Sequence, residues 1–384
     1  MAPTGGVWMG AERVLVLRLD NLGDLVMLSP ALRALRSALP GAEVTLMASP
    51  TGARVAPLLP WVDQVMEEVV VWQALGRPGP PDPAREQALV GRIAEARFDV
   101  AFIFTSFSQS PLPAGYACLL AGVPVRVGQS KEFGGAVLSP ELPSPPDECH
   151  QVDRNLALVE AIGVPVAARN LELVVPGDVR EGADRLLAAV GLARGEPFVA
   201  LAPGASAPAR RYHPGHFGAV ARALVDDVGL PVVVVGSPGD IPLAAEVVAA
   251  GGAGGGAEAD SGITSLCGRT SVPELAAVVA RASLVVTNDS GCMHLADAFA
   301  RPVVVTFAGT DLESQWAPRT SPSLLLRRRT WCAPCYEIEC PYARECLDID
   351  PAEVVAAGLD LLKAPAAPPA PPVPPPLLAP GTRP

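Results

Sequence analysis

The stretch at residues 283–300, SLVVTNDSGCMHLADAFA, has the pattern of a buried strand, a tight polar turn and a helix. Residues 284–286 are apolar, and residues 288–291 then offer helix-capping side chains and a glycine where the helix must begin. Such a helix start attracts anions, so we expect a phosphate or diphosphate beside residues 290–292 and within reach of His294. An ordinary capped strand-to-helix turn is an equally good interpretation of the local pattern.

Length and composition indicate a globular protein of two domains. The chain has 384 residues, of which 49% are hydrophobic and 5% aromatic. That length suits two domains of roughly 150 to 200 residues each. No apolar run reaches the roughly 18 residues that a membrane span needs, and residues 1–10 lack the features of a signal peptide. We therefore expect a cytoplasmic protein.

The charge of the chain narrows the classes of partner. A formal net charge of −11 argues against general nucleic-acid binding, which rests on clustered Lys and Arg. The three arginines at residues 327–329 form the one notable basic run. They are interpreted first as a solvated strand end, and second as a patch for an anionic acceptor or for the inner face of the plasma membrane.

A second strand, turn and helix pattern stands near the N-terminus. Residues 13–19 are almost wholly apolar, as expected of a central parallel strand, and a helix is predicted over residues 25–39. Gly23 permits the tight turn between them and leaves Asp24 at the mouth of the helix. The Asp24 carboxylate is either a helix-dipole partner or a base that faces a cleft.

Strand patterns recur along the rest of the N-terminal half, which predicts an α/β, doubly wound sheet. They fall at residues 43–48, 64–71, 99–105 and 125–128, and residues 133–147 are predicted to be a glycine- and proline-rich loop. The pattern restarts near residues 165–178. In the second half, the strands at residues 198–201 and 231–235 and near Leu266 end in small residues or helix caps, which implies a nucleotide pocket.

The predicted domains follow from that restart. Residues 12–168 are predicted to form an N-terminal domain, and residues 169–363 a C-terminal domain. Residues 364–384 are mostly Pro and Ala and are expected to be disordered or polyproline-like.

Five short motifs, taken together, resemble the ADP-heptose:lipopolysaccharide heptosyltransferases, glycosyltransferase family 9. They stand in family order over most of residues 12–362, at residues 19–24, 29–32, 203–205, 236–237 and 287–294. Neither half has the G-x-G-x-x-G motif in its first strand-helix turn, which disfavours a dehydrogenase. The resemblance implies a GT-B architecture, with two Rossmann-like domains facing across a cleft, and inverting transfer that needs no metal.

The resemblance also implies roles for individual residues. Asp24 would be the general base that takes the proton of the acceptor hydroxyl. Arg211 stands where relatives often carry a lysine, and would meet the charge of the departing diphosphate. The positions expected to bind the donor are Ser206, Asp240, Thr270, Asp289, Ser290, Gly291, Cys292 and His294.

Each of these residues also has an ordinary structural interpretation. Asp24 and Asp240 are plausible helix caps, and Arg211 a plausible surface cation. Taken singly, the structural interpretation is favoured for each residue. Taken together and in family order, the functional interpretation is favoured.

Four cysteines form a second cluster with the spacing C-x2-C-x4-C-x5-C, namely Cys332, Cys335, Cys340 and Cys346. Four thiolates can bind a structural zinc tetrahedrally, but this spacing is tighter than that of common zinc ribbons. Free or reversibly oxidised thiols are the favoured alternative in a cytoplasmic chain.

The expected partners are therefore a nucleotide sugar, ADP-heptose first, and a lipid-linked or oligosaccharide acceptor. Catalysis is expected to need no cofactor. Three alternatives remain at this stage: transfer from another nucleotide sugar, a GT-B nucleotide-sugar epimerase with its acid and base on the donor side, and a binding module that has lost transfer.

Overall fold

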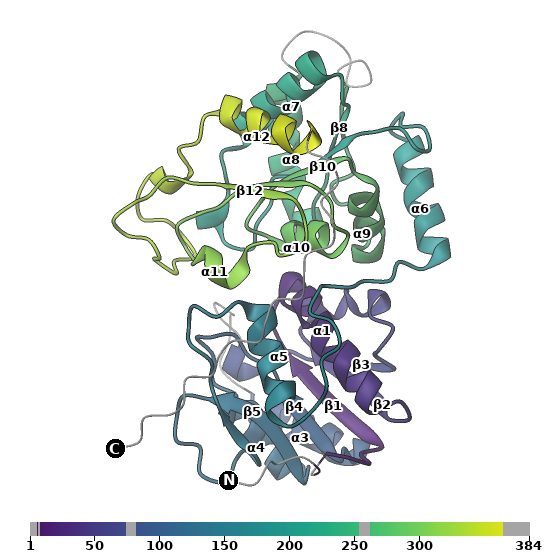
Figure 1. Ribbon diagram of the computed structural model, residues 1–384, viewed down its shortest axis with the longest axis vertical. Coiled ribbons are helices and arrows are strands. Elements are labelled where there is room, and N and C mark those ends of the chain that lie inside the picture. The colour runs from purple at the N-terminus through teal and green to yellow at the C-terminus, as the bar shows by residue number, and fades with distance from the viewer. Residues whose placement is uncertain (1–5, 7, 74–81, 253–261, 364–384) are drawn as a thin grey trace.

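The computed structural model describes residue 6 and residues 8–73, 82–252 and 262–363. In this part of the chain, two parallel sheets occupy the two halves of the molecule (Figure 1). The predicted Pro/Ala-rich tail at residues 364–384 lies outside the described residues. No helix in the described part is both long enough and apolar enough to cross a bilayer.

The N-terminal sheet has the strand order β3-β2-β1-β4-β5-β6. Its central strand β1 is buried at every position after Arg13, which explains its continuous apolar sequence. The strands are β1 Arg13–Arg18, β2 Glu43–Ala48, β3 Gln64–Glu67, β4 Val100–Ile103, β5 Val125–Ser130 and β6 Glu141–Pro143. The α-helices of this half are α1 Leu22–Ala38, α2 Pro50–Ala53, α3 Pro83–Ala96, α4 Leu112–Leu120 and α5 Gln151–Ala161.

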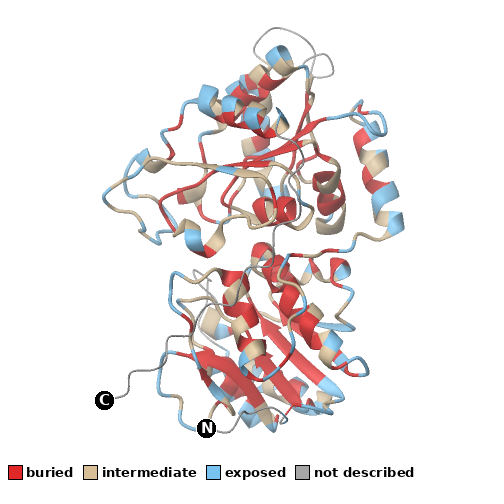
Figure 2. Cartoon of the chain, viewed as in Figure 1, coloured by how far each residue is buried: buried red, intermediate tan, exposed pale blue. Residues whose placement is uncertain are grey.

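The C-terminal sheet has the order β12-β11-β10-β7-β8-β9. Its strands are β7 Val199–Ala202, β8 Val232–Val234, β9 Ile263–Ser265, β10 Leu284–Asn288, β11 Val303–Thr306 and β12 Ser323–Leu326. Its α-helices are α6 Gly177–Ala188, α7 Pro214–Val228, α8 Ile241–Gly251, α9 Val272–Arg281, α10 Gly291–Ala298, α11 Glu313–Trp316 and α12 Pro351–Lys363. Buried residues concentrate on the strands of both sheets and on the helix faces against them (Figure 2).

Both sheets have the strand order of the Rossmann fold, 3-2-1-4-5-6, when each half is numbered from its own first strand. The order reverses between β1 and β4 in the first half and between β7 and β10 in the second. Ligands of such sheets bind at the carboxyl ends of the strands beside that reversal. The predicted functional turns follow β1 and β10, so each lies at the reversal point of its own sheet.

Three local predictions need correction. The strand predicted at residues 64–71 ends at Glu67, and a short 3-10 helix occupies Val71–Gln73. The predicted loop at residues 133–147 contains β6, which pairs in parallel with β5. Helix α1 begins at Leu22, three residues before the predicted start, because Asn21 and Asp24 together form a capping box.

Candidate active site

The two reversal points meet where the first turn of α1 touches the first turn of α10 (Figure 1). A Cβ atom added to Gly23 would lie 2.5 Å from Cδ2 of His294, and one added to Gly291 would lie 2.8 Å from Cδ2 of Leu22. Contacts this short exclude any side chain at the two glycines. The glycines therefore bring the turn after β1 directly against the turn after β10.

A cavity of about 820 Å³ opens beside this contact, a size typical of small-molecule sites. The N-terminal half contributes residues 21–23, Thr51 of α2 and Arg54 to its lining. Arg211 also lines it, together with most of the predicted donor-binding residues, namely Ser206, Asp240, Thr270, Ser290, Gly291 and Cys292. The structure therefore brings together, in one cavity, residues that are more than 80 positions apart in the sequence.

The start of α10 forms one wall of the cavity. Ser290 is the N-cap residue, but its side chain makes no capping hydrogen bond and instead lies 3.0 Å from Oγ1 of Thr287. The backbone N–H groups of the first turn are therefore not capped by that serine. Such N–H groups, together with the helix dipole, favour an anion at this wall.

Two further residues offer polar groups to the cavity. Oδ2 of Asp240 accepts hydrogen bonds from the N–H group and the hydroxyl of Ser237, at 2.9 and 2.6 Å. Gly204 leaves room for this carboxylate, since an added Cβ would lie 2.5 Å from Cγ of Asp240. Oγ1 of Thr270 is buried and has no hydrogen-bond partner among the described residues. A buried hydroxyl without a partner costs free energy, so a ligand that bonds it gains affinity.

Asp289 and His294 lie behind the cavity and do not line it. Burial raises the pKa of Asp289 to about 6, although the guanidinium of Arg210 opposes that rise. Burial, and then the charge of Arg210, lowers the pKa of His294 to about 4, so its imidazole is neutral at pH 7. The two side chains support the contact between the halves, and a direct contact of either with the donor stays a prediction.

The sequence analysis missed Arg210, the residue before Arg211. The guanidinium of Arg211 donates twice to the carbonyl of Ala205, at 2.9 and 3.1 Å, and so braces its own loop. Arg210 instead lies 2.7 Å from Asp311 and 3.8 Å from Asp289. Asp289 directly follows β10, and Asp311 lies in the loop after the neighbouring strand β11. These two acidic residues could have indicated from the sequence that a cation lies between them.

Arg210 also connects the two halves electrostatically. Burial lowers its pKa, but the carboxylates of Asp289, Asp311 and Asp24 raise it by a larger total amount. Asp24 belongs to the N-terminal half, so the predicted base and this cation face one another across the domain contact. Arg210 is therefore better placed than Arg211 to act together with Asp24.

Asp24 lies at the third position of α1, next to the cavity residue Gly23. Its Oδ1 accepts a 2.7 Å hydrogen bond from Nη2 of Arg18, and its Oδ2 lies 3.2 Å from the backbone nitrogen of Asn21. The side chain is 16% exposed, so the carboxylate is held in place but is not sealed off. Asp24 is a helix cap, as one interpretation of the sequence expects, and its role as a base stays a prediction.

A second cavity, of about 320 Å³, lies at the same edge of the N-terminal sheet. Its walls are apolar at Leu19, Trp72 and Phe104 and polar at Gln73 and Gln109. The side-chain nitrogens of both glutamines donate to Oδ1 of the carboxylate that follows β1, Asp20. A mixed lining of this kind suits a sugar ring, which has apolar faces and a hydroxyl rim.

The four cysteines predicted as zinc ligands lie in the segment after β12. Burial raises the pKa of Cys346, and the charges of the other three thiols add to that rise, so the four lie near one another. All four are free thiols. Within the described ranges, however, no group of three or more His, Cys, Asp or Glu side chains is arranged to hold a metal ion. The structural zinc stays a prediction.

Comparisons with known proteins agree with this arrangement. Residues 96–345, more than half of the chain, match the model of glycosyltransferase family 9 (heptosyltransferase). Lipopolysaccharide heptosyltransferase 2 of Salmonella typhimurium is 30% identical over 302 residues, covering 77% of this chain and 82% of the relative.

Two solved structures share the fold. A glycosyl transferase of family 9 from Veillonella parvula has a TM-score of 0.73 at 20% identity, over 91% of this chain and 97% of the other. The ADP-heptose lps heptosyltransferase II of Escherichia coli has a TM-score of 0.70 at 23% identity, over 91% and 98%. These likenesses confirm the predicted GT-B fold, and the match to the family model shows that the chain belongs to glycosyltransferase family 9, the heptosyltransferases.

Proposed function

We propose that this chain is an inverting glycosyltransferase that moves a heptose from ADP-heptose to a lipopolysaccharide-core or related lipid-linked acceptor. The names of its relatives supply the class of donor and acceptor. The observation that carries the proposal is that the helix start bearing Asp24 packs against the start of α10, close enough to Arg210 for the two charges to interact. A base and an anion site on opposite sides of one contact are what a displacement at a sugar phosphate requires.

The reaction forms one bond and breaks one. The acceptor oxygen attacks the anomeric carbon and forms the new glycosidic bond, while its proton passes to the Asp24 carboxylate. The bond from the anomeric carbon to the diphosphate oxygen breaks, and ADP leaves with the electron pair. Attack opposite the leaving group inverts the anomeric configuration.

The leaving group gains negative charge as its bond breaks. The N–H groups at the start of α10 and the guanidinium of Arg210 are fixed donors that can meet this charge. Because these groups supply positive charge at the diphosphate, we propose that transfer needs no metal ion. Turnover is then expected to persist in excess EDTA.

We propose that the N-terminal domain, residues 12–168, binds the acceptor at the 320 Å³ cavity lined by Gln73 and Gln109, and that the C-terminal domain, residues 169–363, binds the nucleotide sugar. A lipid-linked acceptor implies work in the cytoplasm at the inner face of the plasma membrane, with peripheral contact. The arginines at residues 327–329 give that contact little support, because Arg327 pairs with Glu313 and Arg328 pairs with Glu353.

Asp24→Asn tests the proposal most directly. The substitution preserves size and removes the base, so kcat is expected to fall roughly 10²- to 10⁴-fold. ADP affinity, measured by calorimetric titration, is expected to stay within about threefold, because Asp24 does not line the donor cavity. Transfer is measured as ADP release together with the mass of the glycosylated acceptor.

The other candidate functions predict different results. A binding module would bind ADP-heptose without turnover in either form of the protein. An epimerase would convert the donor in the absence of acceptor, and Asp24→Asn would leave that conversion intact. Wild-type transfer that Asp24→Asn does not slow would refute Asp24 as the base.

A further inference from the structure

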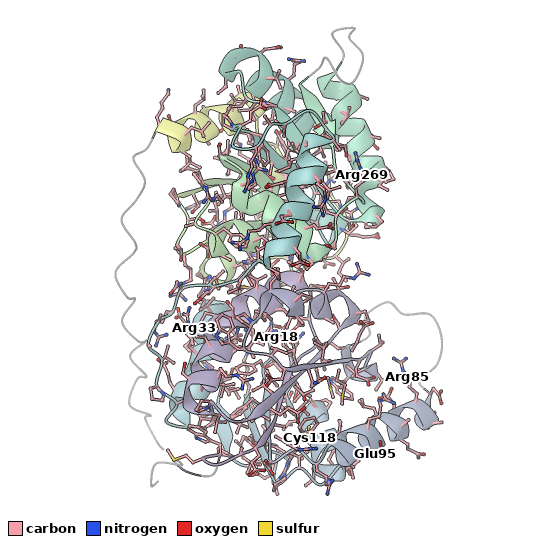
Figure 3. All side chains as sticks on the ribbon, turned by 90° about the vertical axis from the view of Figure 1, so that its right-hand side faces the viewer. Arg18, Arg33, Arg85, Glu95, Cys118 and Arg269 are labelled. Atoms are coloured by element: carbon pink, nitrogen blue, oxygen red, sulfur yellow. The ribbon has the colours of Figure 1, made fainter. Side chains whose placement is uncertain are left out.

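Arg18, the last residue of β1, is completely buried between two carboxylates. Its Nη2 donates to Oδ1 of Asp24 at 2.7 Å, and its Nε lies 2.7 Å from Oδ2 of Asp20. The first contact is an aligned hydrogen bond, whereas the second is a close approach of charges without hydrogen-bond alignment. Figure 3 shows Arg18 in the N-terminal half, on the side toward the domain contact. One guanidinium therefore serves two acidic side chains.

Asp20 is held from its other side by amides. Nε2 of Gln73 and Nε2 of Gln109 donate to its Oδ1 at 2.6 and 2.5 Å. Burial raises the pKa of Asp20, which the charge of Arg18 and the two amide hydrogen bonds oppose, while Asp24 adds to the rise. Arg18 and two amides thus surround one carboxylate, which keeps it fixed and partly offsets the cost of burying its charge.

Other charged groups also face this pair. Arg210 and Asp289 of the C-terminal half carry opposite charges, and both lie close enough to Asp24 to interact with it. Arg154 of α5 lies close enough to Arg18 for the two cations to interact. The imidazole of His294, against Gly23, is neutral at pH 7. Among these groups, Arg18 is the one that donates a hydrogen bond to Asp24.

We propose that Arg18 and Asp20 are positioning residues for Asp24. The inference rests on the proposed role of Asp24 in proton transfer. Arg18 donates to Oδ1 of Asp24 while Oδ2 lies against the backbone N–H of Asn21, so the carboxylate is held in one orientation. Asp20 is the second carboxylate partner of the same guanidinium, so Arg18 does not depend on Asp24 alone for a counter-charge.

The proton transfer itself explains why two carboxylates are needed. When Asp24 takes the acceptor proton it becomes neutral, and a buried guanidinium with no other partner would then be left uncompensated. An unpaired buried charge is costly, so that cost would oppose the transfer. With Asp20 in place, Arg18 remains paired before and after the step, and the proton moves without leaving a buried charge alone.

The test is the pH dependence of kcat/KM in wild type, Asp20→Asn and Arg18→Lys. Asp20→Asn removes the second carboxylate, so proton transfer to Asp24 would leave the buried guanidinium of Arg18 without a counter-charge. The plateau of the profile is therefore expected to fall about tenfold. Arg18→Lys keeps the charge but loses the fork, and kcat is expected to fall roughly 100-fold through misorientation.

Arg33→Lys is the matched control. Arg33 also lies in the N-terminal half (Figure 3), pairs with Glu172 and lines neither cavity. Its profile is expected to match that of wild type. Thermal unfolding and ADP titration establish that each variant is folded and binds nucleotide normally.

A folded Asp20→Asn enzyme whose profile superimposes on that of wild type would overturn the role of Asp20 as the second partner of Arg18. A folded Arg18→Lys enzyme with wild-type kcat would overturn the positioning role. Either result, combined with an inactive Asp24→Asn enzyme, leaves the proposed function standing and removes only this inference. An active Asp24→Asn enzyme removes both.

Discussion

The two halves of the chain share one strand order but differ in the chemistry at the point where that order reverses. After β1 the N-terminal half places two carboxylates, Asp20 and Asp24, on one buried arginine. After β10 the C-terminal half places a glycine-containing helix start beside a cation, Arg210. The same fold therefore presents paired carboxylates on one side and a helix start with a nearby cation on the other, so the two reversal points differ in their side chains and not in their topology.

Four substitutions test this difference between the halves, and the largest effect, on kcat, is expected from replacing Arg210. Replacing it by Ala removes the cation that faces Asp24, and kcat is expected to fall roughly 10²- to 10³-fold, as on loss of a fixed donor to a developing charge. Arg211→Ala is the matched comparison and is expected to act less strongly, since Arg211 braces the loop at Ala205. A larger loss from Arg211→Ala would restore the assignment made from the sequence.

The second prediction concerns stability at the contact between the halves. The pKa of His294 is about 4 in the folded chain and about 6.5 when unfolded, so the unfolded state binds more protons between these values. The free energy of unfolding is therefore expected to fall as pH drops from 6.5 to 4, by up to about 3 kcal/mol from this group. The His294→Gln protein is expected to lack this pH-dependent loss in the free energy of unfolding.

Chemical denaturation at several pH values measures the contribution of His294 to the free energy of unfolding. His150, whose burial lowers its pKa to about 4 as well, stays in both proteins and cancels in the comparison. Equal pH slopes in wild type and His294→Gln would show that His294 does not carry the predicted linkage.

A smaller effect is expected on the donor side, at Gly204. Its added Cβ would lie 2.5 Å from Cγ of Asp240, so Gly204→Ala must displace that carboxylate. Loss of one charged hydrogen bond to the donor raises KM for the nucleotide sugar by about tenfold. Gly91→Ala in α3 is the control, because an added Cβ there meets nothing within 4 Å. An unchanged KM would remove Asp240 from the donor site.

The smallest effect is expected at the surface. Arg327 pairs with Glu313 at 2.7 Å, and a partly exposed pair contributes less than about 1 kcal/mol. Arg327→Gln is expected to leave unfolding and co-sedimentation with anionic vesicles nearly unchanged. If the substitution instead released the protein from vesicles, the arginine run would be a membrane patch after all.

Much of the fold could be predicted because local pattern and tertiary position agree. The stretch at residues 283–300 contains β10 at Leu284–Asn288 and α10 at Gly291–Ala298, with the glycine at the helix start as expected. Residues 43–48 likewise form β2 with unchanged bounds. In these segments the apolar run, the cap and the glycine all favour one structure.

The site predictions that failed depend on contacts between side chains that are distant in the sequence, which no short stretch of residues reveals. Arg210 and Arg211 are adjacent and identical in type, and only the short 3-10 turn at Pro208–Arg210 decides which guanidinium meets Asp289. His294 has the spacing of a ligand-binding residue, yet the close approach of Gly23 from the other half buries it. In the sequence, Arg18 is simply one residue of a predicted strand, and only the structure shows that it pairs with two carboxylates.

The contact of Gly23 with His294 has a mechanical consequence. When one half rotates about a fixed point, each atom moves in proportion to its distance from that point. Asp24 and Ser290 lie within one helical turn of this contact, whereas Arg54 and Thr270 line the 820 Å³ cavity from opposite halves. A rotation about this contact would therefore change the width of the cavity while Asp24 and Ser290 keep nearly the same separation.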